Sequence, residues 1–528
     1  MIHVIAPGSE QATAQLLVSA LQRSCGQGSA TLGSASLLAI LPGEQPAVYV
    51  LIHPREEWTD ALLKLLRSPV KLILLGRLST GLAQALDVTL AHEWPQDWAV
   101  TTTCPPAPIH GAAESTARVV YPATAPQIAN RVPAQMERPF RRYDYAEEWN
   151  NLGYGAITAD GTCWSIAQHA TAQSENQLAQ VHLGEALLCS FAALWDRPAS
   201  SVLWFNRAAG PIDSQEWRIV EDFLSCHRHK ELPCEPVLSE VPHGFDSAVT
   251  MRLDCDENIE SARALWELYR SEAVPFSLAL HARVLTDERH HRLPCEVLAE
   301  GGAILSHTAT HAPNWGGNHE AAFHEGQTSA AVIESAIGCR VRYAVSPFHQ
   351  TPAYARLGLA DAGYQGCIGG IICNDPDFLT ARAGIPPASG MGFIGHSQQC
   401  MLHGDCMLAE GDPLRSFRQA FDIARTGGAF FGYLDHPFSE RYTYGWLNEE
   451  QRLQAHKDLI AHIKTAGGRI LWANEDDAMD FLFDRAHTAV MSLDGSYRIK
   501  RTVQNSSWPL SVRHRGQHIC IEQEGLLP

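Results

Sequence analysis

Charged side chains end an apolar, strand-like run at residues 248–257, which reads Ala-Val-Thr-Met-Arg-Leu-Asp-Cys-Asp-Glu. The period-two alternation of a strand places Arg252, Asp254 and Asp256 on one face. Carboxylates in this arrangement can bind a metal ion or accept a proton, and they can equally be ordinary solvated acids at a strand end. The segment is therefore a candidate site whose chemistry depends on the residues beside it.

Two histidines four residues apart follow a second apolar run, residues 301–311, which reads Gly-Gly-Ala-Ile-Leu-Ser-His-Thr-Ala-Thr-His. Neutral imidazoles at this spacing can bind one metal ion, with an Asp as the third protein ligand and water in the open position. With 25 His in 528 residues, roughly one such pair is expected by chance. The position of His307 and His311 after a strand, about fifty residues beyond Asp254, therefore carries more weight than their spacing.

The order of these motifs resembles that of the NodB-type polysaccharide deacetylases, carbohydrate esterase family 4. The shared order is Asp-Cys-Asp after a strand, His-Thr-x-x-His, a Ser-Pro-Phe segment at residues 346–348, and a late strand, residues 430–436, that ends in His. The resemblance covers residues 244–484. It implies an irregular (β/α) barrel and a divalent metal that serves the removal of acetyl groups from N-acetylated sugars.

Carried over position by position, the resemblance implies three metal ligands and two proton-transfer groups. Asp256, His307 and His311 correspond to the ligands, Asp254 to the general base and His436 to the general acid. Amide hydrolysis needs an activated water, stabilisation of the developing oxyanion and a proton for the departing amine. These five residues, together with a metal, supply all three.

Other positions of the matched motifs either support the site or depart from the family. The resemblance implies that Thr308 braces the metal site and that the backbone N–H of Phe348 helps to hold the oxyanion. The third motif of the family normally begins with Arg, and Val345 stands at that position in this chain. In the first motif, Cys255 separates two acids that are usually adjacent.

A cation near the general base would keep it ionised and oriented. Arg252 is the candidate for this role, because it lies two residues before Asp254 on the same expected strand face. The alternatives are that Arg252 pairs with another acid for stability, or that Arg342 supplies the cation. The acidic segment at residues 372–377 stands where the family has an Asp-Trp motif.

The predicted function is that of a metal-dependent carbohydrate deacetylase, a hydrolase. The ligand types suit one divalent metal ion, with Zn²⁺ as the first choice and Co²⁺ or Ni²⁺ as alternatives. The expected substrate is an N-acetylated sugar or oligosaccharide of an envelope glycan, or its nucleotide- or lipid-linked precursor. Two alternatives stay open: a non-catalytic glycan-binding or scaffold protein with a decayed barrel, which Val345 suggests, and an amidohydrolase that acts on a non-sugar amide.

The predicted fold class is α/β with several domains, because strand-like and helix-like patterns alternate along most of the chain. N-terminal parallel α/β layers precede the irregular (β/α) barrel, and a small C-terminal β appendage follows it. The expected divisions are a Rossmann- or flavodoxin-like domain at 1–93, a proline-rich linker at 94–139, a second α/β domain at 140–243, the NodB-like barrel at 244–484, and the appendage at 485–528.

Composition excludes several classes of partner. The formal net charge of −18 argues against nucleic acid, which requires a cationic surface. The first residues lack a cationic n-region, and no apolar run approaches the ~20 residues of a membrane helix. The 14 Cys contain no Cys-x-x-Cys pair, which is typical of reduced thiols. We therefore expect a cytoplasmic protein with a sugar substrate, no integral membrane segment and no nucleic-acid partner, and its oligomeric state stays open.

Overall fold

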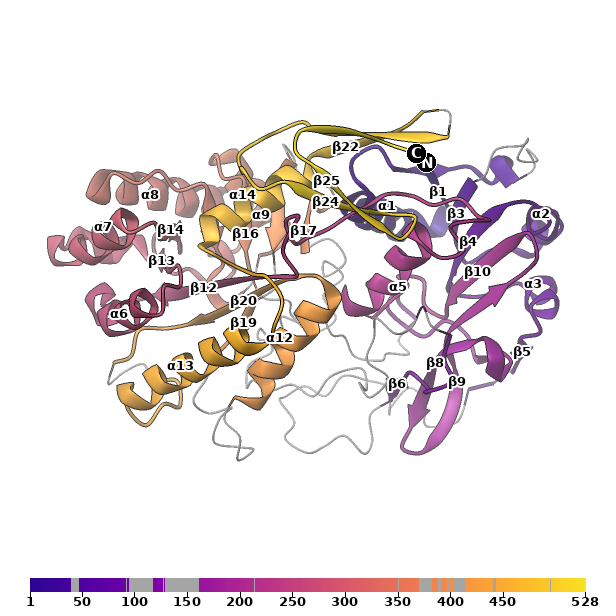
Figure 1. Ribbon diagram of the computed structural model, residues 1–528, viewed down its shortest axis with the longest axis horizontal. Coiled ribbons are helices and arrows are strands. Elements are labelled where there is room, and N and C mark those ends of the chain that lie inside the picture. The colour runs from indigo at the N-terminus through magenta and orange to yellow at the C-terminus, as the bar shows by residue number, and fades with distance from the viewer. Residues whose placement is uncertain are drawn as a thin grey trace.

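The computed structural model describes residues 1–38, 47–91, 93–94, 117–126, 128, 161–212, 214–349, 351–369, 382–387, 392–396, 399–402, 414–439, 443–493 and 495–528. Two large sheets lie beside each other in the view of Figure 1, one built mainly from the first 240 residues and one from the later part of the chain. The C-terminal strands cross above the junction between them. The candidate site residues all belong to the second sheet or to the loops that follow its strands.

The N-terminal sheet has eight strands in the order β2-β1-β3-β4-β10-β9-β8-β6. Its first five strands pair in parallel, and the last three are antiparallel. The strands are, in sheet order, Ala30–Gly33, Ile2–Ile5, Ala47–Ile52, Val70–Leu75, Ser200–Phe205, Ala186–Asp196, Gln177–Leu183 and Arg118–Val120. The parallel α/β layer expected for residues 1–93 is therefore present.

The expected separation of two N-terminal α/β domains is wrong at the level of this sheet. β10 pairs along its whole length with β4, so strands from 1–93 and from 140–243 share one set of hydrogen bonds. β6, from within the expected linker, pairs with β8 in the same sheet. All six residues of β4 are buried, and such an apolar strand needs a neighbour on both edges to satisfy its backbone polar groups.

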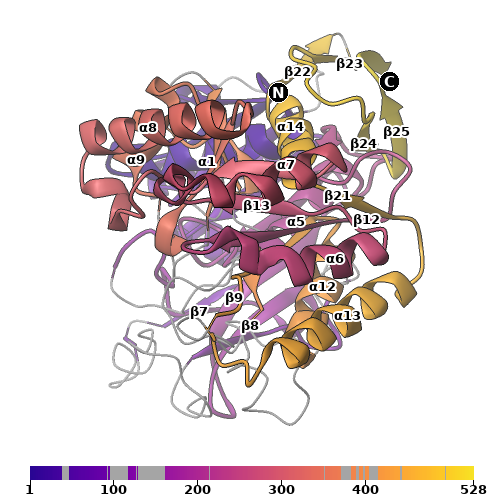
Figure 2. The ribbon, with the colours of Figure 1, turned by 90° about the vertical axis from the view of Figure 1, so that its left-hand side faces the viewer.

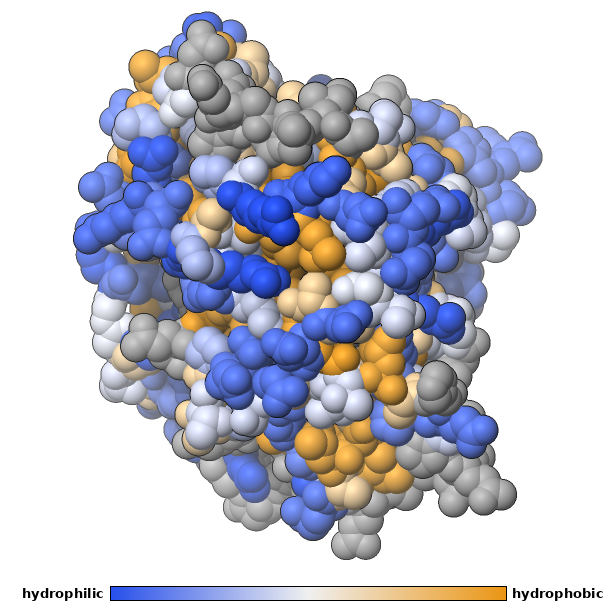
Figure 3. Space-filling model, turned by 90° about the vertical axis from the view of Figure 1, so that its right-hand side faces the viewer, coloured by the Kyte–Doolittle hydropathy of each residue, from blue (hydrophilic) through white to orange (hydrophobic). Residues whose placement is uncertain are grey.

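Helices cover both faces of the N-terminal sheet. α1 (Gln11–Cys25) and α5 (Ser214–Ser225) share one hydrophobic cluster with the strands, and α2 (Thr59–Leu65) and α3 (Thr80–Ala85) share the other. The side of the molecule with α2 and α3 is largely hydrophilic, with separate hydrophobic patches between the polar side chains (Figure 3). This three-layer arrangement buries both faces of the parallel strands.

The second sheet has ten strands and is parallel except at β17. Its main path is β17-β18-β16-β15-β14-β13-β12-β20-β19, and β21 pairs with the first half of β12. The strands are, in this order, Arg382–Gly384, Ile394–His396, Gly366–Ile368, Tyr343–Val345, Ala303–Ser306, Ser277–Leu280, Ser247–Cys255, Phe430–Asp435, Gln399–Met401 and Ile470–Ala473. The carboxyl ends of β12, β14 and β20 therefore open on the same side.

Helices cover the outer face of the second sheet, and Figure 2 shows α6, α7 and α8 in front of its strands. Alternation along β12 directs Val249, Met251 and Leu253 into the hydrophobic cluster under these helices. The opposite face of β12 carries Arg252 and Asp254, so the polar residues point away from the helical layer. The helices of this layer are α6 (Arg263–Ser271), α7 (Arg292–Ala299), α8 (His319–Ile337), α9 (Ala353–Asp361), α12 (Arg415–Gly427) and α13 (Glu449–Thr465). In contrast, α14 (Glu475–Ala486) packs in the hydrophobic cluster of the opposite face.

The C-terminal segment forms the β structure that the sequence indicates, with five strands among its described residues. They are β22 (Thr488–Leu493), β23 (Ser496–Arg501), β24 (Leu510–His514), β25 (Gln517–Ile521) and β26 (Glu524–Leu527). β24 and β25 form a small sheet with β11 (Val237–Leu238), and the other three form a second. This segment binds the N-terminal sheet as well, because Gln27 exchanges backbone hydrogen bonds with Thr488 and Val490.

Buried ion pairs join the parts of the chain. Arg218 of α5 contacts Glu221 and, at 3.2 Å, Glu240, which also accepts a hydrogen bond from Arg382 of β17 at 3.1 Å. Arg513 of β24 contacts Glu221 at 2.8 Å. Removing one partner of a buried pair leaves an uncompensated charge, so this junction ties the N-terminal layer to both later parts. None of the helices in the described residues is long and apolar enough to cross a membrane.

Candidate metal centre

Arg252 and Asp254 form a buried ion pair on β12. Arg252 Nε donates to Asp254 Oδ1 at 2.6 Å, and Nη2 donates to Oδ2 at 3.4 Å. Burial alone would raise the pKa of Asp254, but the Arg252 guanidinium, with the His307 and His436 imidazoles, lowers it to about 2. The carboxylate is therefore ionised at neutral pH and fixed in orientation. Arg342, the alternative cation, pairs with a different acid, because its Nη1 lies 2.6 Å from Asp480 Oδ1.

His307 follows β14 and is oriented by the next strand of the sheet. Its Nδ1 lies 3.1 Å from the carbonyl oxygen of Val345. A carbonyl only accepts hydrogen bonds, so Nδ1 carries a proton, and the lone pair of the neutral ring is on Nε2. Val345, which replaces the family arginine, therefore contributes its backbone carbonyl, while its side chain packs in the hydrophobic core.

A tight turn carries the chain from His307 to His311. Thr308 and His311 have φ angles of +68° and +56°, which non-glycine residues rarely adopt. The Thr308 hydroxyl accepts a hydrogen bond from the His311 backbone N–H at 2.8 Å. The carboxylate of Glu325, on α8, accepts hydrogen bonds from the Ala309 and Thr310 backbone N–H groups and the Thr310 hydroxyl. These bonds hold a strained turn in the shape that directs both imidazoles inward.

The three expected metal ligands converge. The ligand atoms of Asp256, His307 and His311 all lie within 4.8 Å of one another. Asp256 Oδ1 lies 3.3 Å from His307 Nε2 and 3.4 Å from His311 Nε2, yet it is buried and has no aligned hydrogen-bond donor among the described residues. Atoms held about 2.1 Å from a tetrahedral ion are about 3.4 Å apart. The spacing therefore fits a divalent cation between the three atoms.

The protonation states of the described site also suit a cation. Burial and the neighbouring His307 lower the pKa of His311 to about 4, so that imidazole is neutral. Burial would lower the pKa of His307, but Asp254 and Asp256 outweigh it and raise that pKa above its ordinary value. Burial opposes ionisation of Asp256, but the adjacent imidazoles hold its pKa well below the ordinary value. The two carboxylates therefore favour a positive charge at this position, and His307 takes up a proton more readily than an ordinary histidine.

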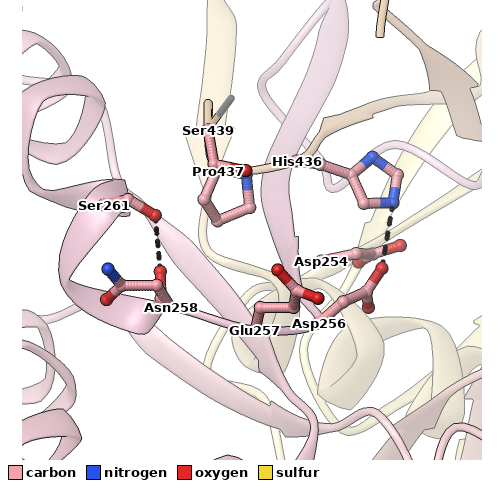
Figure 4. Close-up of a pocket in the computed structure, with 8 residues that line it drawn as sticks. All are labelled: Asp254, Asp256, Glu257, Asn258, Ser261, His436, Pro437 and Ser439. Carbon is pink, nitrogen blue, oxygen red and sulfur yellow. Dashed lines mark hydrogen bonds and ion pairs between the residues drawn. The ribbon is translucent and has the colours of Figure 1, made fainter. Parts of the chain in front are cut away.

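His436 approaches the same carboxylates from the end of β20 (Figure 4). Its Nε2 lies 3.9 Å from Asp256 Oδ2, and its side chain is 11% exposed. The Tyr444 ring stacks on the His436 imidazole with a centroid separation of 4.2 Å. The five residues that the resemblance assigns to base, acid and metal ligands are thus gathered at one place.

A small, open pocket lies beside these residues. Asp254, Asp256 and His436 line it on one side, and a turn with Asn258 and Ser261 lines it on the other (Figure 4). Phe348 is 42% exposed, and its ring centroid lies 4.8 Å from that of His311. The described site therefore offers carboxylates, imidazoles and an exposed aromatic ring to a small polar group.

The structure adds two neighbours of the site, Glu325 and His281, to those expected from the sequence. Glu325 is separated from the turn that it stabilises by a 3-10 helix and part of α8. His281 follows β13 directly, as His307 follows β14, and its Nδ1 lies 3.0 Å from the Asp256 carbonyl oxygen. That strand-end position is a signal that could have identified it. The expected acidic segment at residues 372–377 lies outside the described residues.

No family model and no curated protein matches the chain. Solved structures that resemble part of the chain include proteins described as a polysaccharide deacetylase or as members of carbohydrate esterase family 4, over about 45% of the chain. A protein of Mycobacterium smegmatis assigned as a polysaccharide deacetylase is 15% identical, with a TM-score of 0.33 over 46% of this chain and 92% of its own.

Two further structures show the range of proteins with this likeness. A PuuE allantoinase is 13% identical, with a TM-score of 0.35 over 46% of this chain and 92% of its own. A family 4 pseudoenzyme from Bacillus anthracis is 17% identical, with a TM-score of 0.29 over 45% of this chain and 67% of its own.

Proposed function

We propose that the protein is a metal-dependent N-deacetylase that hydrolyses the acetamido group of an N-acetylated sugar. The observation that supports this most is the convergence of Asp256, His307 and His311 beside a buried carboxylate, Asp254, and a second proton-transfer group, His436. Each type of group needed for amide hydrolysis is therefore present at one site.

Asp254 is the proposed general base. It accepts a proton from the attacking water, and Arg252 keeps it ionised and oriented for this step. A Glu or Asp general base usually has a raised pKa. The low pKa of Asp254 would be offset here if a metal ion acidified the water that gives up the proton. A divalent ion held by Asp256, His307 and His311 would supply that acidification and would polarise the acetyl carbonyl.

His436 is the proposed general acid. Amines are poor leaving groups unless they are protonated as the C–N bond breaks. His436 follows β20, the parallel neighbour of β12, and its Nε2 lies 3.9 Å from Asp256 Oδ2. The proposed acid and the proposed base therefore line the same side of the pocket, where both can reach one scissile amide. We assign the Phe348 backbone N–H to the oxyanion, as the resemblance implies.

The position of Arg252 speaks against the alternative of a decayed, non-catalytic barrel. That alternative depends on Val345 in place of an arginine, and the Arg252 guanidinium contacts Asp254 through two nitrogen atoms. A cation is thus still paired with the proposed base. The open cavity is suited to an acetamido group with the rest of the sugar outside it, as in an envelope glycan or its nucleotide- or lipid-linked precursor.

Acetate release tests the proposal. The purified protein, loaded with Zn²⁺, Co²⁺ or Ni²⁺ in turn, is incubated with N-acetylated sugar nucleotides, chito-oligosaccharides and N-acetylated amino acids. We expect acetate from at least one sugar and none from the Asp254→Asn variant. Release only from the amino acids would favour the non-sugar amidohydrolase, and no release from a fully metallated protein would contradict an enzymatic role.

A further inference from the structure

The backbone on both sides of the His436 side chain is held by buried charges. Asp435 Oδ1 accepts a hydrogen bond from the His436 N–H at 2.8 Å, and Arg452 Nη1, from α13, donates to the His436 carbonyl at 2.7 Å. Asp435 and Arg452 also pair with each other, with Nε 3.4 Å from Oδ2. Both side chains are 0% exposed. A carboxylate and a guanidinium thus hold the two peptide groups of one residue.

A chain of buried hydrogen bonds anchors this pair in turn. His456 Nε2, also on α13, lies 2.9 Å from Asp435 Oδ2, and its Nδ1 lies 2.8 Å from the Tyr269 hydroxyl. The carboxylate accepts, so His456 Nε2 donates to it. The Tyr269 hydroxyl contacts that of Tyr433 at 2.6 Å. These groups are fully buried, where loss of a hydrogen-bond partner is costly.

We infer that Asp435 and Arg452 are positioning residues that hold the His436 imidazole in the orientation needed to protonate the departing amine. The inference rests on the proposed function, because it takes His436 as the acid. Neither residue lines the cavity, so each acts through the His436 backbone. The Tyr444 ring lies against the imidazole, so a shift of the His436 peptide would also move the ring relative to its stacking partner.

A comparable buried ion pair lies away from His436. Arg501 and Asp484 form a comparable buried pair, with Nη2 2.7 Å from Oδ2 and side-chain exposures of 3% and 1%. The other Arg501 bonds reach the carbonyls of Ser506, Trp508 and Glu522, in the C-terminal β segment. Arg501→Met is therefore a matched control, since it removes a buried guanidinium of the same kind away from His436.

Two substrates separate loss of the acid from general damage. Hydrolysis of an N-acetylated sugar needs a protonated leaving group, whereas 4-nitrophenyl acetate releases 4-nitrophenolate without a proton from the enzyme. For Arg452→Met, we expect kcat for the amide to fall at least about tenfold, with KM unchanged and ester hydrolysis within about twofold of the wild type. Arg452→Lys, which keeps a cationic donor, should recover part of the amide activity. Arg501→Met should leave the amide-to-ester ratio unchanged.

An amide-to-ester ratio that is unchanged in Arg452→Met, whether both activities are lost equally or neither is lost, would overturn the inference. A second readout does not require turnover. The NMR signal of the His436 imidazole is recorded in metal-free protein with ¹⁵N-labelled histidine and is assigned by its loss in His436→Ala. This signal should shift in Arg452→Met and should not shift in Arg501→Met. An unmoved signal would also overturn the inference. A wild type that releases no acetate would overturn the proposed function instead, and a shifted His436 signal would still support the positioning contact.

Discussion

Arg252 and Asp254 lie against each other on one strand, with Nε 2.6 Å from Oδ1 and side-chain exposures of 0% and 1%. The two residues are neighbours on the same face of β12 because strand side chains alternate. The cation beside Asp254 is therefore supplied by the same strand. The Asp254 carboxylate is therefore oriented by a residue of its own strand.

Replacing Arg252 should change the pH dependence of turnover. The Arg252 cation lowers the pKa of Asp254, so its loss raises that pKa, and the base becomes protonated at a higher pH. For Arg252→Met we expect reduced turnover, retained metal and an acidic limb of the pH–rate profile shifted upwards. Arg252→Lys should shift it less. An unchanged pH–rate profile in a folded, metallated Arg252→Met protein would show that Arg252 does not control the ionisation of the base.

Asp254→Asn should separate catalysis from metal binding. An amide cannot accept the proton of the attacking water, so acetate release should fall by roughly 10²- to 10⁴-fold. Elemental analysis should still find one metal ion for each chain, because Asp254 is not one of the three converging ligands. Asp256→Asn is the matched variant and should lose metal. Parallel loss of metal and activity in Asp254→Asn would make Asp254 a ligand instead.

The double variant His307→Ala/His311→Ala should bind no stoichiometric metal, because it removes both converging Nε2 atoms. The double variant His319→Ala/His324→Ala is a suitable control, since both side chains lie on α8 and are 47% and 62% exposed. Elemental analysis after dialysis measures the difference. A metal content that survives loss of His307 and His311 would place the ion elsewhere.

The affinity of the site for a metal ion should fall as the pH is lowered. The raised pKa of His307 means that the metal-free site holds a proton below that pKa, and a cation must displace it. The apparent Kd for Zn²⁺ should therefore rise as the pH is lowered from about 8 to about 5. Calorimetry in buffers of different ionisation enthalpy would count the released protons. A pH-independent Kd with no proton release would contradict a protonated His307.

Glu325→Ala should weaken metal binding without removing a ligand. The Glu325 carboxylate accepts three hydrogen bonds from Ala309 and Thr310, inside the strained turn that carries both imidazoles. We expect metal affinity to fall by about 10- to 100-fold. Glu320→Ala, on the same helix with a side chain 86% exposed, should have no such effect. Equal affinities for the two variants would show that the turn holds without Glu325.

The sequence by itself, through strand ends and the resemblance of its motif order to a known family, pointed to the residues that come together at the candidate site. Asp256, His307 and His436 each follow an apolar run, and the carboxyl ends of parallel strands in one sheet open on the same side. The alternation of β12 was enough to predict that Arg252 faces Asp254. These features could be predicted because each depends on a local period and a strand end, which are visible within about ten residues.

Only the tertiary structure decided which strands are neighbours. β10 completes the N-terminal sheet by pairing with β4, 130 residues before it, and an apolar strand does not specify which other strand it pairs with. The contacts of Glu325 with the His311 turn and of Arg452 with the His436 carbonyl likewise join helices to loops through backbone atoms. Every residue has the same backbone groups, so such contacts leave no mark in the residue pattern, and packing alone determines them.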